Sequence, residues 1–204
     1  MKESQKTVYS RSVVEFVAAA NEFCKYVERA QELKGDDLLK ILQRILPFMY
    51  VKASLLPVLQ PHFEDGNEKF VTEEKWEQIN NLLSEKFGTA DDYLEIFDIK
   101  SADAESAVVA SISENMTDIY QDIKDFLLLY QTGTHEVMND AIWECKLNFE
   151  NHWGQKLVNS LRAIHSLIYS GEEIAAVEKK IEDRDTSDWF ITKRQQDFRK
   201  HGKV

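Results

Sequence analysis

The sequence predicts an all-α protein folded as an up-and-down bundle of five to six helices. Glycine and proline are scarce, at 7 and 3 of 204 residues, so the turn residues that a many-stranded sheet needs are largely missing. Long stretches instead repeat apolar residues every three or four positions, which is the period of an amphipathic helix. The connections between these stretches are mostly short, and short connections favour antiparallel neighbours.

We expect one bundle domain over residues 1–171, a length sufficient to bury a sizeable core. Residues 172–204 are predicted to be a charged C-terminal extension. Its last segment has a capping residue at Ser187 and is expected to form a short helix docked on the bundle.

The first predicted helix spans residues 10–33 and ends before Gly35, a residue typical of helix C-termini. The second spans residues 36–59 and is apolar on almost every side, which is typical of a helix in the middle of a bundle. Pro47 lies inside it and is expected to kink or split it, because proline lacks the backbone donor and clashes with the preceding turn.

Residues 61–71 are predicted to form a loop, in which Asp65 and Gly66 favour a small hairpin. The third helix follows, from the N-cap residue Thr72 to Gly88.

An acidic and aromatic connection over residues 91–100 leads to the fourth predicted helix, residues 103–131. The fifth spans residues 134–169. The link between these two helices is short, so we expect them to be antiparallel neighbours.

The net charge of −11 argues against a general nucleic-acid binder, which needs a basic surface to displace phosphate counterions. The last twelve residues carry +4 and the rest −15, so the basic tail is expected to fold back on its own acidic body. The most apolar segment, residues 38–59, contains three basic residues and is a poor membrane span. We therefore expect no nucleic-acid and no membrane partner. A protein partner and the oligomeric state stay open.

Cys24 and Cys145 are the two cysteines, fewer than a disulfide framework needs. The N-terminus lacks the apolar core of a secretory signal. We expect a cytoplasmic protein, with Cys24 as a buried small hydrophobic residue.

The common sequence motifs of catalytic, nucleotide-binding and metal-binding sites are missing. The sequence has no GxxxxGK[ST] or GxGxxG loop, no CxxC or HExxH, and no Glu-x-x-His of the di-iron bundles. We expect no cofactor and no metal, and the question of an enzyme leans towards no.

The stretch NFENHWGQKL places Glu150 and His152 two positions apart, so their side chains do not face each other on a helix. At about 100° per residue, Glu150 is predicted to face the core beside Trp143 and Leu157, and His152 to face outward. Glu150 is then either a satisfied buried polar residue that fixes helix register or a site carboxylate with a raised pKa. The third alternative is that Glu150 is exposed.

The fourth helix carries Ser111, Asn115, Asp118 and Asp122 at spacings of four, three and four, which places them in one column. The antiparallel fifth helix could bring this column towards Glu150, Arg162 or His165. The candidate polar cluster consists of Asp118, Asp122, Glu150 and His165. Paired carboxylates can hold a hard cation or share a proton. The alternative is a solvated face, or partners for basic residues of a neighbouring helix.

Three stretches, DDYLEIFDIK, ENMTDIYQDIKDFLLLY and AIWECKLNFENHWGQKLVNSLRAIHSLI, resemble segments of a bacterial family of helical proteins. That family is a domain of unknown function found in Bacteroides-like bacteria and in actinobacteria. The resemblance covers the first to the fifth helix and leaves out the charged extension. It implies a compact helical domain in a bacterial cytoplasm and transfers no catalytic or binding residue.

Our leading hypothesis is a non-enzymatic binding or interaction module, with a protein as partner. The alternative is an enzyme, or a bundle that binds a small ligand or metal, with a polar pocket between the fourth and fifth helices. A third reading is a structural subunit that uses one helix face for self-association.

Overall fold

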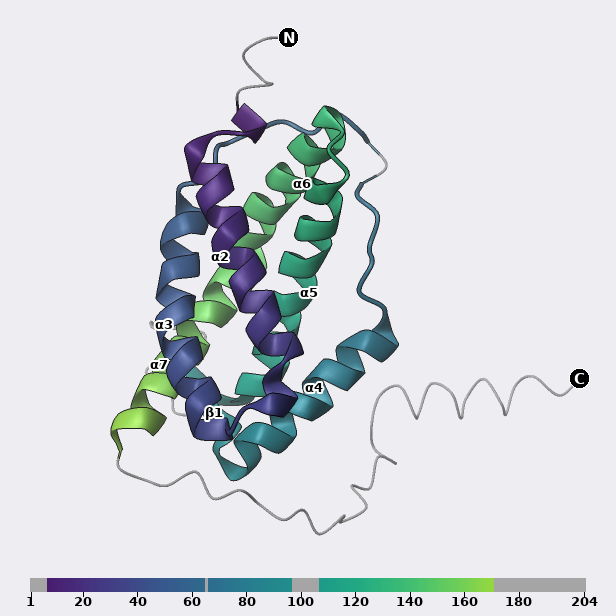
Figure 1. Ribbon diagram of the computed structural model, residues 1–204. Coiled ribbons are helices and arrows are strands. Elements are labelled where there is room, and N and C mark those ends of the chain that lie inside the picture. Colours follow the sequence, from purple (N-terminus) through teal and green to yellow (C-terminus); the bar gives the residue numbers. More distant parts are fainter. Residues whose placement is uncertain (1–6, 65, 97–106, 171–204) are drawn as a thin grey trace, which may run out of the picture.

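A computed structural model describes residues 7–64, 66–96 and 107–170. The described helices are α2 (Arg11–Glu28), α3 (Gly35–Ser54), α4 (Glu73–Phe87), α5 (Ile112–Gln131), α6 (His135–Asn148) and α7 (Gly154–Tyr169). α3 packs between α2 and α7, while α5 contacts α2, α4, α6 and α7. Figure 1 shows these long helices side by side, with α4 crossing one end of the bundle. The predicted all-α class is confirmed. The predicted terminal helix lies outside the described residues.

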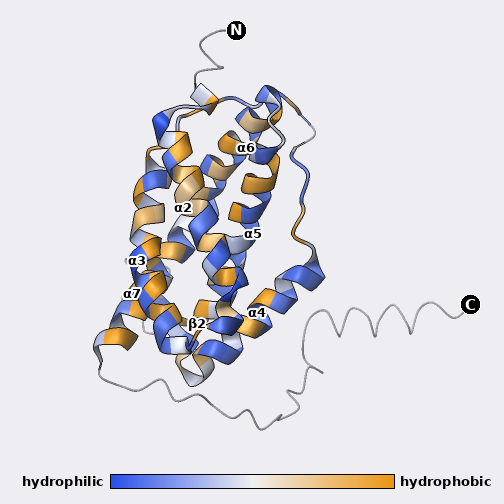
Figure 2. Ribbon diagram, in the orientation of Figure 1, coloured by the Kyte–Doolittle hydropathy of each residue, from blue (hydrophilic) through white to orange (hydrophobic). Residues whose placement is uncertain are grey.

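All six helices contribute buried apolar residues to one shared core. Trp153 is fully buried in it. The Trp153 ring stacks on Phe16, with centroids 6.4 Å apart, and lies 4.8 Å from the ring of Phe149. Each helix also carries hydrophilic residues. Figure 2 shows hydrophilic residues (blue) alternating with hydrophobic residues (orange) along the helices of the bundle. This pattern is what amphipathic helices around one core require. Within the described chain, no helix has the length and apolarity to cross a membrane.

α3 differs from its prediction in two ways. It continues through Pro47 without a break, because Pro47 lies on the exposed side, where water can bond to the carbonyl that proline leaves free. α3 is also not enclosed by other helices. Phe48, Val51 and Leu55 are exposed by 49, 52 and 57%, so its solvent side is apolar as well as its core side.

A two-stranded antiparallel sheet, β1 (Asp92–Ile96) with β2 (Ala107–Ser111), replaces the predicted start of the fourth helix. Tyr93 pairs with Ala110 in this sheet. The predicted helix is wrong over residues 107–111 because the AVVAS stretch favours an extended backbone. α5 begins only after Ser111, whose hydroxyl caps it by accepting from the N–H of Glu114 at 3.2 Å.

The connection between α3 and α4 spans residues 55–72. Figure 1 shows it crossing one end of the bundle and then descending beside α5 to α4. No strand pairing occurs in its described residues, so the predicted hairpin is wrong. The predicted cap is confirmed, since Thr72 accepts from the N–H of Lys75 at 3.3 Å.

A π-helical turn, Phe149–Trp153, joins α6 to α7. It interrupts what the sequence predicts as one uniform helix. A π turn holds one more residue than an α turn, so side chains before and after it no longer follow one 3.6-residue period.

Candidate functional site

The structure does not bring the four residues of the predicted cluster together. Asp118 accepts from the Trp76 indole at 2.8 Å and from Lys156. Asp122 accepts from Asn148 at 2.9 Å and lies 3.1 Å from Nδ1 of His152. In the described chain, no hydrogen bond or ion pair joins Glu150 or His165 to either aspartate.

The prediction that Glu150 faces the core is wrong. Its side chain is 53% exposed and pairs with Lys146, 3.3 Å away. The cause is the π turn, since one extra residue rotates the following side chains by about 100° relative to a uniform helix. The buried face of α6 carries Ile142 and Cys145, whereas Leu147, which the uniform helix places inside, is 41% exposed.

His165 and His152 both lie at the surface. His165 is exposed, and its ring lies 4.7 Å from that of Tyr169. His152 is half exposed, as predicted, but it turns towards Asp122 on α5. The partner of Asp122 is therefore His152 and not Glu150.

The predicted polar column of α5 exists, and each of its members bonds to a different part of the chain. Ser111 donates to Asp91, at 3.1 Å, and Asn115 donates to the hydroxyl of Tyr93 in β1 at 2.7 Å. Asp118 and Asp122 bond to the groups named above on α4, α6, α7 and the π turn. The column therefore ties the surrounding elements to α5. This arrangement corresponds to the alternative in which the polar residues of the column bond to neighbouring helices.

Asp125 extends this column, and sequence reasoning missed it. It is 2% exposed, and its Oδ1 accepts from the backbone N–H groups of Phe70 and Val71, at 2.9 and 3.0 Å. Burial raises the pKa of Asp125, although the two N–H groups oppose the rise. The available signal was its position three residues after Asp122, which continues the spacing.

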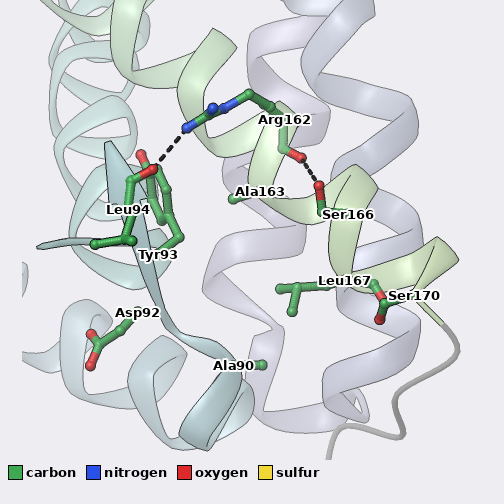
Figure 3. A pocket seen from close by; sticks show the side chains of 9 residues that line it. All are labelled: Ala90, Asp92, Tyr93, Leu94, Arg162, Ala163, Ser166, Leu167 and Ser170. Carbon is green, nitrogen blue, oxygen red and sulfur yellow. Dashed lines mark hydrogen bonds between the residues drawn. The ribbon is translucent and has the colours of Figure 1, made fainter. Parts of the chain in front are cut away.

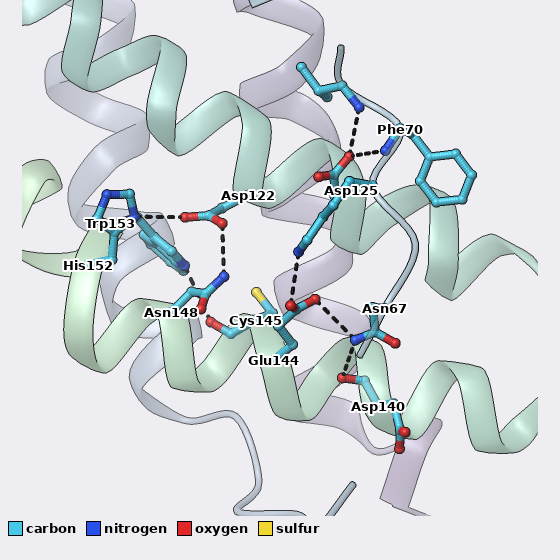
Figure 4. A network of polar contacts seen from close by, with 12 residues as sticks. Asn67, Phe70, Asp122, Asp125, Asp140, Glu144, Cys145, Asn148, His152 and Trp153 are labelled. Carbon is cyan, nitrogen blue, oxygen red and sulfur yellow. Dashed lines mark hydrogen bonds and ion pairs between the residues drawn. The ribbon is translucent and has the colours of Figure 1, made fainter. Parts of the chain in front are cut away.

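Asp140 on α6 holds the same loop at a second point. Figure 4 shows Asp125 bonded to Phe70, and the Asp140 carbonyl bonded to Asn67. The Asp140 carboxylate accepts from the N–H groups of His62 and Phe63, at 2.7 and 2.8 Å, and is 2% exposed. Asn67 of the loop donates to the Asp140 carbonyl and to Glu144. The buried acids of α5 and α6 thus fix an irregular segment by accepting from its backbone.

A third buried polar group lies beneath the sheet. Glu95, 7% exposed, accepts from Asn159 of α7. Burial raises the pKa of the nearby Tyr93 hydroxyl to about 12, and the charge of Glu95 adds to this rise. These contacts fasten β1 to α5 and α7.

This arrangement provides acceptors for donors of neighbouring elements. Burial raises the pKa of both Cys24 and Cys145, so neither thiol ionises readily to a nucleophile. Both are free thiols. Among the described residues, no group of three or more His, Cys, Asp or Glu side chains could hold a metal ion.

The surface offers a different feature, which we call the α3 apolar face: Phe48, Val51 and Leu55. Their spacing of three and four places them on one side of the helix. Each is about half exposed. The side chains of Arg44 and Lys40, one and two turns before Phe48, are exposed as well.

The fold and these contacts define a helical-bundle domain that is fastened by buried carboxylates and carries one apolar helix face. The chain belongs to the family described as Domain of unknown function (DUF5063), whose model matches residues 7–170. The family resemblance expected from the sequence is confirmed.

A solved structure supports the same relationship. The chain is similar to protein BF1032 from Bacteroides fragilis, with 39% sequence identity and a TM-score of 0.73. The match covers 81% of this chain and 98% of that one. A comparison with curated proteins gave no match.

Proposed function

We propose that this chain is a non-enzymatic interaction module of the bacterial cytoplasm, and that its α3 apolar face binds a partner protein. The observation that carries the proposal is the half-exposed row of Phe48, Val51 and Leu55 on one side of α3. The cytoplasmic placement is supported by the two free thiols, which suit a reducing compartment.

Single exposed apolar residues are ordinary on protein surfaces, whereas grouped ones mark interaction sites. Sixteen large hydrophobic residues are exposed in the described chain, and three of them, Phe48, Val51 and Leu55, share one side of α3 and its C-cap. The grouping favours a contact surface over chance exposure.

The charges beside this face indicate the chemistry of the partner. Lys40 and Arg44 share its side of the helix, and neither forms an ion pair within the described residues. The chain as a whole carries −11, whereas these two side chains place positive charge beside the apolar face. We infer a partner with an apolar helix face flanked by carboxylates, which fits a groove-and-helix contact.

The available area sets the strength of such a complex. Completing the burial of three half-exposed side chains yields about 2–4 kcal/mol. The entropy lost on association costs roughly 4–15 kcal/mol. The α3 apolar face therefore needs the adjoining Lys40 and Arg44, and we expect a weak, reversible complex.

The enzyme alternative has less support. It requires free acid–base groups between α5 and α7, and the side chains of Asp118, Asp122 and Glu150 are already bonded to neighbours.

The proposal can be tested by site-specific photo-cross-linking in the cells that produce this chain. A photoreactive residue at Val51, 52% exposed on α3, is compared with one at Val158, 44% exposed on α7. We expect one acidic protein to be attached at Val51 only, and the charge reversal Arg44→Glu to reduce the yield. Adducts at both positions, no adduct, or an adduct only with a second copy of this chain would overturn the proposal.

A further inference from the structure

A cavity of about 390 Å³ lies between β1 and α7, away from the α3 apolar face. Its size falls within the range of small-molecule sites. Figure 3 shows its wall from β1, with Tyr93 and Leu94, and its wall from α7, with Arg162, Ala163 and Leu167. None of these residues belongs to the surface proposed for the partner protein.

The interior of this cavity is mainly apolar. Leu167 supplies a large side chain, and Ala90 and Ala163 leave the space beside it open because they end at Cβ. An apolar group placed here would be removed from water.

Arg162 is a charged side chain at the rim of the cavity. Its Nη2 donates to the carbonyl of Leu94 at 2.8 Å, which fixes the guanidinium beside the cavity. A guanidinium has five N–H donors, and this bond uses one. No carboxylate pairs with Arg162 in the described chain, and Figure 3 shows the Asp92 side chain directed away from it.

Three of the four other polar side chains of the lining are already engaged, and the fourth, Asp92, points away from Arg162. Ser166 donates to the carbonyl of Arg162 at 3.2 Å, and Ser170 donates to that of Leu167 at 3.1 Å. The hydroxyl of Tyr93 accepts from Asn115 beneath the sheet. Arg162 is therefore the group that can orient a ligand.

We propose that this cavity binds a small monocarboxylate with an apolar body. The carboxylate pairs with the free edge of the Arg162 guanidinium, a geometry that suits two parallel N–H···O bonds. The apolar body lies against Ala90, Ala163 and Leu167.

The test uses hexanoate as the probe, with the full chain and amide NMR titration as the readout. We expect saturable shifts at Ala163 and Leu167. Hexanamide, which has the same chain without the charge, should bind about tenfold more weakly or worse. Arg162→Gln should weaken hexanoate binding by a similar factor, while Arg11→Gln, at an exposed arginine on α2, should leave it unchanged.

Two further outcomes make the test decisive. Ala163→Leu should fill the cavity and remove hexanoate binding, and its folding is checked by the unfolding midpoint. Equal binding of hexanoate and hexanamide, or unchanged binding to Arg162→Gln, would overturn the proposal, and so would shifts that never saturate. Because none of these variants lies on α3, the result is independent of the proposed partner protein.

Discussion

The backbone N–H of His62 donates to the carboxylate of Asp140 over 2.7 Å, although the two residues are 78 positions apart. The next N–H, of Phe63, donates to the other oxygen at 2.8 Å. An 18-residue connection without regular structure is uncommon in a compact domain. Here the connection is held in place because buried carboxylates accept the backbone hydrogen bonds that a helix or sheet would otherwise accept.

Asp140→Ala should therefore destabilise the protein substantially. The substitution leaves two backbone donors without acceptors in a site where Asp140 is 2% exposed, and each such group costs about 1–3 kcal/mol. We expect a loss of about 3 kcal/mol in the free energy of unfolding, measured by urea denaturation. Hydrogen exchange should accelerate at the amides of His62 and Phe63.

Glu150→Ala is the matched control, because it removes an acid that is 53% exposed and paired within its own helix. Exposed pairs contribute little, so we expect a change within about 0.5 kcal/mol. Equal losses for the two variants would contradict the role assigned to Asp140.

The contrast between Asp140 and Glu150 also explains what the sequence could and could not predict. The helices and the column from Ser111 to Asp122 follow from periodicity, which is a local property. The orientation of Glu150 depends on the π turn, which a uniform helical period cannot reveal. The strand pair of β1 and β2, and the partners of Asp125 and Asp140, depend on distant segments meeting in space. No local pattern specifies those contacts.

Gly154→Ala should destabilise the protein although alanine is the better helix former. A Cβ on Gly154 would lie 2.3 Å from the backbone oxygen of Phe149 and 2.9 Å from its ring. The clash forces the π turn to shift, and overpacking of this kind costs about 1–3 kcal/mol.

Chemical denaturation of Gly154→Ala checks this prediction, with Gln155→Ala as the control at an exposed neighbouring position. Without the clash, alanine would gain up to about 1 kcal/mol over glycine. A variant more stable than the native chain would therefore rule out the close approach to Phe149.

Stability should fall in acid partly through Glu15. Hydrogen bonds from Lys52 and Arg11 lower the pKa of Glu15 to about 2. The pKa of Glu15 is lower in the folded chain than in the unfolded chain, where it is near 4.5. Its carboxylate therefore stabilises the folded state at pH values above 4.5, and this contribution is lost as the pH falls towards 2.

The measurement is the unfolding midpoint between pH 6 and pH 2 for the native chain and for Glu15→Gln. The native chain should lose more stability over this window, and the difference should shrink in high salt because the pairs are at the surface. Parallel pH profiles would contradict the role of Glu15.

Both thiols should resist modification in the folded protein. Cys24 and Cys145 are 2 and 3% exposed, and burial raises the pKa of each. A thiol reagent at pH 8 should label neither until denaturant is added, when both should react. Fast labelling of the native chain would show that one of these sites opens.

The affinity of the cross-linked partner for two aspartate variants tests the proposed function most directly. Val51→Asp places a charge on the α3 apolar face, whereas Val158→Asp places the same charge at a similarly exposed valine of α7. Neither should change the free energy of unfolding by more than about 0.5 kcal/mol. We expect Val51→Asp to weaken partner binding by at least about tenfold, with Val158→Asp unchanged. Equal affinities of the two variants would contradict a docking role for α3.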